Sequence, residues 1–113
     1  MKTVLNIPIP PSVNSMYVNV PRRGRVKSGA YVKWIKSAGW ELQCQPHPRV
    51  PGKVNVLIEI RRPTANSDVD NRVKATLDLL VSHGVIDDDR HVQTITARWA
   101  EGIDGCRVTV EAA

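Results

Sequence analysis

The stretch from Lys53 to Arg62, KVNVLIEIRR, limits the possible folds of this chain more than any other. Successive side chains of a β-strand point to opposite faces, so an alternating segment has one apolar and one polar side. The apolar side of this stretch carries Val54, Val56, Ile58 and Ile60. The stretch therefore predicts a half-buried strand whose apolar face packs against a second layer of structure.

Three further segments show the same alternation. Lys2–Ile9 predicts a first strand that stops at Pro10-Pro11, because proline cannot continue a sheet ladder. Val92–Ala100 and Cys106–Glu111 predict two strands that the turn Glu101–Gly105 joins as a hairpin.

Two segments have the periodicity of helices. Ser28 is a suitable N-cap for a helix over Ala30–Gln45, in which apolar residues recur at spacings of three, four and seven. A second helix is predicted over Asp70–His83, with Gly84 placed to end it. Its core-facing stripe consists of Val73, Thr76, Leu77 and Leu80. Strands and helices in this mixture indicate an α+β fold, and 113 residues fit one domain with a single core.

The charges are unevenly distributed. Residues 1–62 contain eleven Lys and Arg against two Asp and Glu, a balance of +9, whereas residues 63–113 contain five against nine, a balance of −4. Ser12–Ser28 is predicted to be a loop, and it carries four of the basic residues, namely Arg22, Arg23, Arg25 and Lys27. A basic body with concentrated acids suits a nucleic-acid binder that has a metal site. Two solvated faces of opposite charge explain the totals equally well.

Several classes of protein are excluded or disfavoured. No apolar run reaches the length of about 18 residues that a membrane span needs, and the N-terminus has no signal-peptide core, so we expect a cytoplasmic protein. Cys44 and Cys106 form no CxxC pattern and are expected to be buried thiols. The three histidines are isolated from one another, which argues against a zinc site; they are His47, His83 and His91.

The segment DVDNRVKATLD, Asp68–Asp78, contains the residues most suggestive of chemistry. Asp68 and Asp70 point to the same side of an extended chain, and Lys74 lies one helical turn beyond Asp70. Asp89 could join them if the chain after Gly84 returns alongside the helix. Magnesium prefers oxygen ligands and takes a few carboxylates together with waters and phosphate oxygens.

These acids have two other interpretations. Asp70 could simply cap the helix, and the later aspartates could shape a turn. An EF-hand loop beginning at Asp68 is excluded, since its sixth position would be Val73 instead of Gly and its twelfth Leu79 instead of Glu.

The segment DVDNRVKATLDLLVSHGVIDDDRHV resembles the signature of the RusA family of Holliday-junction resolvases, which are crossover-junction endodeoxyribonucleases frequent in bacteria and their prophages. The shared features are D-x-D-N, a lysine four residues after the second Asp, an apolar helix, Gly84 and an Asp pair. PIPPSVNSMY near the N-terminus also resembles the family pattern. The resemblance implies a single two-layer domain over residues 1–113, with a mixed β-sheet packed against two helices.

The resemblance also implies roles for single residues. Asp68, Asp70 and Asp89 would be the catalytic carboxylates that hold Mg²⁺, with Asp88 as an acidic neighbour, and Lys74 would stabilise the transition state. Because Asp87, Asp88 and Asp89 are consecutive, which of them is the third ligand stays open, and Asp89 is preferred.

The implied activity is magnesium-dependent resolution of four-way DNA junctions by paired symmetric nicks, in DNA recombination and repair. Two nicks by chains with one site each imply a homodimer. The predicted DNA-binding residues are Arg22, Arg23, Arg25 and Lys27. Two other functions stay open: a non-catalytic nucleic-acid-binding protein, and a metal-dependent nuclease that acts on other branched or single-stranded DNA.

Overall fold

The computed structural model describes all residues from Met1 to Ala113. In chain order its elements are β1 (Lys2–Ile7), η1 (Val13–Ser15), β2 (Tyr17–Val20), β3 (Gly24–Lys27), α1 (Gly29–Gln43), β4 (Val54–Ile60), η2 (Asp70–Arg72), α2 (Val73–Ser82), η3 (Asp89–His91), β5 (Val92–Trp99) and β6 (Cys106–Ala112), where η marks a short 3-10 helix.

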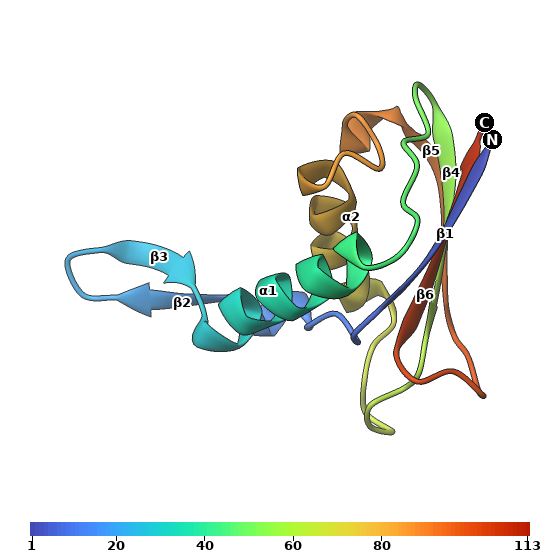
Figure 1. Cartoon of the computed structure of the whole chain (residues 1–113). Helices are drawn as coiled ribbons and strands as arrows, with labels where there is room; N and C mark the ends of the chain where they lie inside the picture. The colour runs from blue at the N-terminus through green and yellow to red at the C-terminus, as the bar shows by residue number, and fades with distance from the viewer.

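Four strands form one mixed sheet in the order β1-β6-β4-β5. β4 runs parallel to β5 and antiparallel to β6, and β1 is antiparallel to β6. Both α-helices lie on one side of this sheet (Figure 1). The predicted α+β fold, with two layers and a mixed sheet against two helices, is therefore confirmed.

The hairpin predicted from Val92 to Glu111 is wrong. Both strands exist, but β4 lies between them and pairs with each. The alternation of apolar and polar residues identifies a strand but does not specify which strand pairs with it. With β4 between them, β5 and β6 are two strand widths apart, which is only about 10 Å. The connection from Ala100 to Gly105 can span that distance, because an extended chain covers about 3.3 Å per residue. β4, with its fully buried apolar face, takes the central place.

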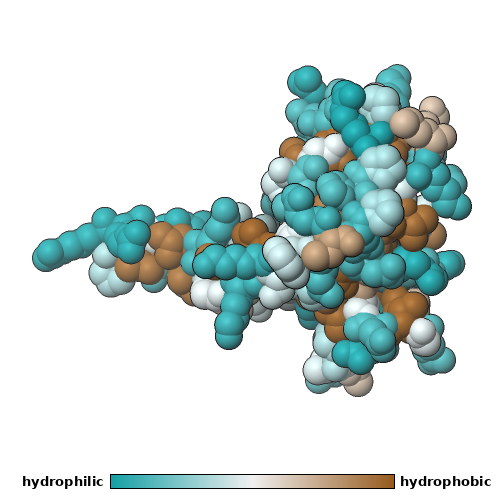
Figure 2. Space-filling model, viewed as in Figure 1, coloured by the Kyte–Doolittle hydropathy of each residue, from teal (hydrophilic) through white to brown (hydrophobic).

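The predicted loop Ser12–Ser28 is also wrong in part, because it contains η1 and a second, two-stranded sheet. β2 and β3 pair from Tyr17↔Lys27 to Val20↔Gly24, and the hairpin projects from the body of the molecule (Figure 1). Its residues are mostly hydrophilic (Figure 2). Because neither face of these strands is buried in the core, they lack the apolar alternation that reveals a strand.

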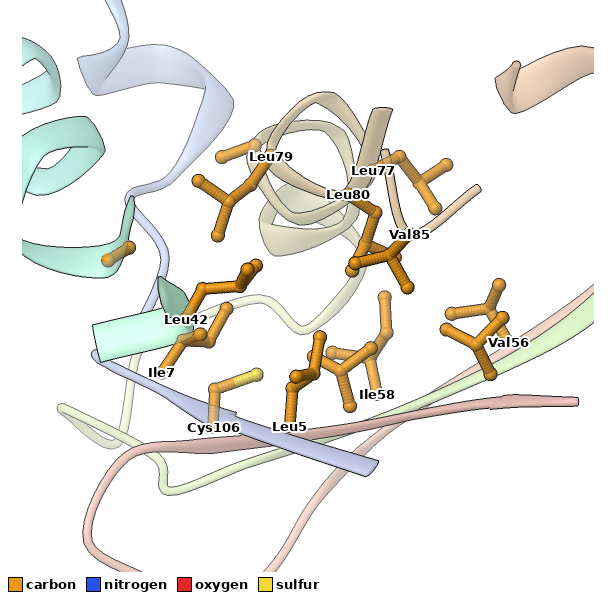
Figure 3. Close-up of a cluster of buried hydrophobic side chains, with 14 of the residues drawn as sticks. Leu5, Ile7, Leu42, Val56, Ile58, Leu77, Leu79, Leu80, Val85 and Cys106 are labelled. Carbon is orange, nitrogen blue, oxygen red and sulfur yellow. The ribbon is translucent and has the colours of Figure 1, made fainter. Parts of the chain in front are cut away.

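The core lies between the sheet and the two helices. Leu5, Ile58 and Cys106 point from the sheet toward Leu42 of α1 and Leu80 of α2 (Figure 3). The four predicted apolar residues of β4 are all buried. Burial of large aliphatic side chains in this way is the main source of stability, at roughly 25 cal/mol per Å² of apolar surface.

The helix predictions are confirmed in their main features. α1 begins one residue earlier and ends two residues earlier than predicted, and the Ser28 side chain accepts a hydrogen bond from the Tyr31 amide at 3.1 Å. In the second helix Thr76, Leu77 and Leu80 are buried. Gly84 follows it with a φ of 72°, a left-handed conformation that favours glycine.

Exposure corrects one expectation about the cysteines and distinguishes the tryptophans. Cys106 is buried, which raises the pKa of its thiol to about 12, but Cys44 is exposed, so its predicted burial is wrong. Trp34 is buried, whereas Trp40 is 73% exposed.

No helix combines the length and apolar character needed to cross a membrane.

The sheet face away from the helices holds a buried acid, Glu59 of β4. Its carboxylate accepts hydrogen bonds from Arg98 Nη2 of β5 at 2.8 Å and from Arg107 Nε of β6 at 3.1 Å. Both bonds lower the pKa of the Glu59 carboxyl, and the bond from Arg107 has the larger effect. Burial acts in the opposite direction and raises this pKa. The carboxylate thereby ties the central strand to both of its neighbours.

Replacing Glu59 by Gln should lower the free energy of unfolding at neutral pH by about 1–3 kcal/mol, because two charge-assisted hydrogen bonds are weakened. Since the folded-state pKa is lowered, this stabilisation is present above the unfolded-state pKa of about 4 and is lost as the pH falls through the folded value. Urea denaturation of both proteins at neutral and acidic pH measures this difference.

The matched control is Glu111→Gln on the same sheet, whose exposed ion pair with Lys2 at 3.7 Å should contribute less than about 1 kcal/mol. Equal effects of the two substitutions, or a Glu59→Gln effect that persists in acid, would contradict the assignment.

Candidate active site

Lys74 lies in the first turn of α2 and is surrounded by acidic and phenolic groups. Its Nζ is 3.1 Å from Asp78 Oδ1, one helical turn further on. That hydrogen bond and the Asp78 charge raise the pKa of Lys74, burial opposes them, and the charges of Asp89 and Tyr17 raise it further. The Lys74 side chain is therefore protonated at neutral pH.

Asp89 reaches this region because the chain reverses after α2. Gly84 makes the turn, Val85 and Ile86 enter the core, and η3 then packs against α2. The exposed Asp89 is the first residue of η3, and its charge acts on Lys74. The return of the chain toward the helix, on which the role of Asp89 depends, is thus present.

Asp68 and Asp70 lie immediately before the helix, and both are exposed. Asp68 is in the loop, and Asp70 is the first residue of η2, which continues into α2. Neither η2 nor α2 has a side-chain cap. Asp70 therefore makes no capping hydrogen bond, although as an acidic residue in the first turn of η2 it still interacts favourably with the helix dipole.

The six aspartates between residues 68 and 89 fall into two groups. Asp78 pairs with Lys74, Asp87 accepts hydrogen bonds from Arg49 Nε at 2.5 Å and the Gly52 amide at 3.3 Å, and Asp88 accepts one from the Arg90 amide at 3.0 Å. The remaining three have no basic partner within 4 Å. We call these three the unpaired aspartates: Asp68, Asp70 and Asp89.

The surroundings of Asp87 and Asp88 bear on the choice of the third ligand. Bonds from Arg49 and Gly52 lower the pKa of Asp87, and the Arg90 amide, as the largest cause, lowers that of Asp88, which caps η3. The Asp89 carboxylate, in contrast, makes no hydrogen bond to a cation or a backbone amide and forms no ion pair. These contacts favour Asp89, with Asp88 as its neighbour.

The chemical nature of the unpaired aspartates fits a hard divalent cation, which takes oxygen ligands and usually only one or two carboxylates besides water and phosphate. No group of three or more His, Cys, Asp and Glu side chains lies close enough together to hold a metal ion. The carboxylate oxygens of the unpaired aspartates are therefore the type of ligand that Mg²⁺ prefers. The fold does not, however, gather three of these carboxylates around one point.

The predicted DNA-binding residues lie on the projecting β2–β3 hairpin, which we call the basic hairpin, with Arg22 and Arg23 at its tip and Arg25 and Lys27 on β3. Its base reaches the candidate site, because Tyr17 and Lys27 line the same cleft as Asp78. The pair formed by Lys74 and Asp78 is thus next to the base of the basic hairpin.

A family model described as Endodeoxyribonuclease RusA matches residues 8–111, which is nearly the whole chain. The chain belongs to the RusA family. Membership indicates an endodeoxyribonuclease of the kind that resolves Holliday junctions, so the resemblance of the Asp68–Val92 segment is confirmed. No curated protein matches the chain significantly.

Two residues near Lys74 were not predicted from the sequence. Asp78 positions Lys74, and its spacing of four residues from the lysine was a usable signal. Tyr17 makes a small contribution to the raised pKa of Lys74, but it belongs to the segment predicted as a loop, and nothing in its spacing indicated proximity to α2.

Replacing Asp78 by Asn should lower the pKa of Lys74 toward the ordinary value of about 10.4, because its hydrogen-bonded counter-charge is removed. Asp89→Asn should lower it by a smaller amount. The measurement is an NMR titration of the lysine side-chain carbons. Asp87→Asn, whose carboxylate faces Arg49, is the control and should leave Lys74 unchanged; an unchanged pKa in Asp89→Asn would separate Asp89 from the site.

Proposed function

We propose that this RusA-family protein is a magnesium-dependent endodeoxyribonuclease that resolves four-way DNA junctions by paired symmetric nicks. One observation carries the proposal: the three aspartates without basic partners are Asp68, Asp70 and Asp89, and they flank a helix that presents Lys74. A purely binding protein that attracts phosphates has no use for unpaired carboxylates beside its cationic surface.

Asp68, Asp70 and Asp89 would hold the metal ion, with Asp88 as an acidic neighbour. Their carboxylates are not gathered around one point in the structure, so binding the ion would require them to move together. A bound Mg²⁺ lowers the pKa of a water and offsets charge on phosphate oxygens. The chain itself supplies Lys74, which stays protonated and can neutralise the negative charge that develops on the phosphate in the transition state. Asp78 holds the ammonium group in place. We infer that cleavage leaves a 5′-phosphate and a 3′-hydroxyl.

DNA binding is assigned to the basic hairpin. Arg22, Arg23, Arg25 and Lys27 are exposed, and the hairpin extends away from the core (Figure 1). Arg25 is also held over the Tyr17 ring, with its guanidinium carbon 4.3 Å from the centroid. Basic side chains of this kind bind phosphates and position the duplex without reading its sequence.

Two nicks of like polarity in one junction require two active sites. Each chain offers one set of unpaired aspartates, so we propose that the protein acts as a homodimer with twofold symmetry. We further propose that it acts in the cytoplasm, in DNA recombination and repair.

Replacing Asp70 by Asn should abolish magnesium-dependent nicking of a synthetic four-way junction and leave binding intact or tighter, because a metal-binding charge is removed with little change in volume. Gel electrophoresis of a labelled junction, with Mg²⁺ or with EDTA, measures cleavage, and a mobility shift in EDTA measures binding. Asp87→Asn is the matched control and should retain cleavage, since its carboxylate pairs with Arg49.

Full cleavage by the Asp70→Asn variant would remove Asp70 from the site. Junction binding by the wild type without any cleavage in Mg²⁺ would favour a non-catalytic binding protein. Equal cleavage of flaps or single strands would identify a nuclease of another specificity.

Replacing Arg22, Arg23 and Arg25 together by Ala should weaken junction binding and flatten the dependence of log K on log salt by roughly one unit for each phosphate that the hairpin no longer neutralises. Titrations at several salt concentrations measure this slope. Lys2→Ala with Lys53→Ala, at the sheet end away from the hairpin, is the control for the removal of charge alone. An unchanged slope in the arginine variant would show that the hairpin does not touch DNA.

A further inference from the structure

A cleft lies between the base of the basic hairpin and the two α-helices, next to Lys74. It has a volume of about 280 Å³ and is lined from four elements, β2, β3, α1 and α2. We call it the aromatic cleft. The lining residues that matter here are Tyr17, Lys27, Tyr31, Trp34, Asp78 and Ser82.

Three aromatic rings form one side of the aromatic cleft. Tyr31 and Trp34 are stacked, with centroids 6.3 Å apart and planes 23° apart. Tyr17 meets Tyr31 edge to face at 5.9 Å. Tyr31 and Trp34 are nearly fully buried and anchored on α1, and the Trp34 indole N–H donates to the Pro8 carbonyl at 3.1 Å. The rings are therefore fixed before any ligand arrives.

The remaining lining is polar and charged. Asp78 offers a carboxylate that can accept hydrogen bonds, and Lys27 offers an ammonium group that can donate them. Burial first, then the charges of Asp78 and Tyr17, raise the pKa of Tyr31, so its hydroxyl stays a neutral donor. A lining that combines aromatic side chains with a few donors and acceptors suits a planar heteroaromatic ring.

The dimensions limit what can enter. Pockets for drug-sized ligands measure about 300–1,000 Å³, so a cleft of about 280 Å³ accommodates one or two fused rings and little more. Its position limits the source of the ring, because the cleft shares Asp78 with Lys74 and is also lined by Tyr17 and Lys27 of the hairpin, so a strand bound at both places would run beside it. Asp78 belongs to both places, since it binds Lys74 and lines the cleft.

We propose that the aromatic cleft receives one unstacked nucleobase of the DNA strand, next to the phosphate that is cut. This inference rests on the proposed function and adds a substrate-positioning site to it. Bases at a branch point lack a complete set of stacking neighbours, so moving one of them out of the stack costs less than in an intact duplex. Stacking against aromatic side chains tolerates any base, while Asp78 favours bases that present an amino group.

The proposal is tested with synthetic junctions in which an abasic site replaces one nucleotide at a time on either side of the cut. With the wild type at saturating concentration and in Mg²⁺, one abasic position should slow cleavage by about tenfold or more, and the others should have little effect. Ser82→Phe, which places a ring in the cleft from an exposed position on α2, should slow cleavage of the intact junction to a similar degree.

The decisive result is the combination of the two changes. If the abasic substitution and Ser82→Phe remove the same interaction, the abasic substitution should not slow cleavage by the Ser82→Phe variant any further. The rate reduction of the combination should then be much smaller than the product of the two separate reductions. Ser37→Phe, an exposed serine of α1 outside the cleft, is the matched control, and thermal unfolding verifies that both variants fold. Tyr17→Ser should slow cleavage at least about fivefold more than Tyr17→Phe, which keeps the ring.

A second measurement does not depend on cleavage. 2-Aminopurine at the sensitive position, or at each flanking position in turn, should change its fluorescence when the wild type binds in EDTA, and should not do so with Ser82→Phe. If the wild type cleaves the junction but shows no sensitive abasic position and no fluorescence difference, the proposed role of the aromatic cleft is contradicted. The proposed nuclease function is then unaffected. A fluorescence difference without any cleavage would overturn the nuclease and retain the cleft, and failure of both measurements would overturn both.

Discussion

The parallel pairing of β4 with β5 is the constraint on which the rest of the structure depends. Parallel neighbours cannot be joined by a tight turn, so the chain must cross over through a long connection that covers the sheet. That connection contains η2, α2 and η3, and it carries every residue of the candidate metal site. Asp68 and Asp70 follow β4, and Asp89 precedes β5, so all three proposed metal ligands lie in the crossover. Burial of the apolar face of β4 therefore helps to fix the position of α2, which carries Lys74, as well as the core.

Within the crossover, the aspartates differ in whether they have a basic partner. The negative charge of a carboxylate with a basic partner is already stabilised by that partner. Coordination of a metal ion by the same carboxylate would break the pair. Asp78, Asp87 and Asp88 have such partners and orient a lysine, a loop and a turn. Asp68, Asp70 and Asp89 have no such partner, which is the basis for proposing them as ligands of a cation. The distinction explains how so many aspartates can be close in sequence in a protein with a net charge of +5.

The sequence was informative where burial is one-sided. The apolar face of β4, the cap at Ser28 and the break at Gly84 all follow from local chemistry, and all three are present. Strand partners could not be predicted, because β5 and β6 look like a hairpin until the competing strand is placed between them. The basic hairpin was missed since both of its faces are open. In the site, Asp68, Asp70, Lys74 and Asp89 came from motif and resemblance, whereas the contribution of Tyr17 depends on a tertiary contact that no spacing reveals.

The unequal exposure of the two cysteines has a practical consequence. Thiol reagents act on accessible thiolates, and burial with a pKa of about 12 keeps the Cys106 sulfur unreactive in the folded state. Cys44, at the end of α1, is open to solvent. The native chain thus has a single chemical handle for a fluorophore or spin label, on the opposite end of α1 from the basic hairpin, without any substitution. Loss of that selectivity, with both sulfurs reacting, would report opening of the core between β6 and the helices.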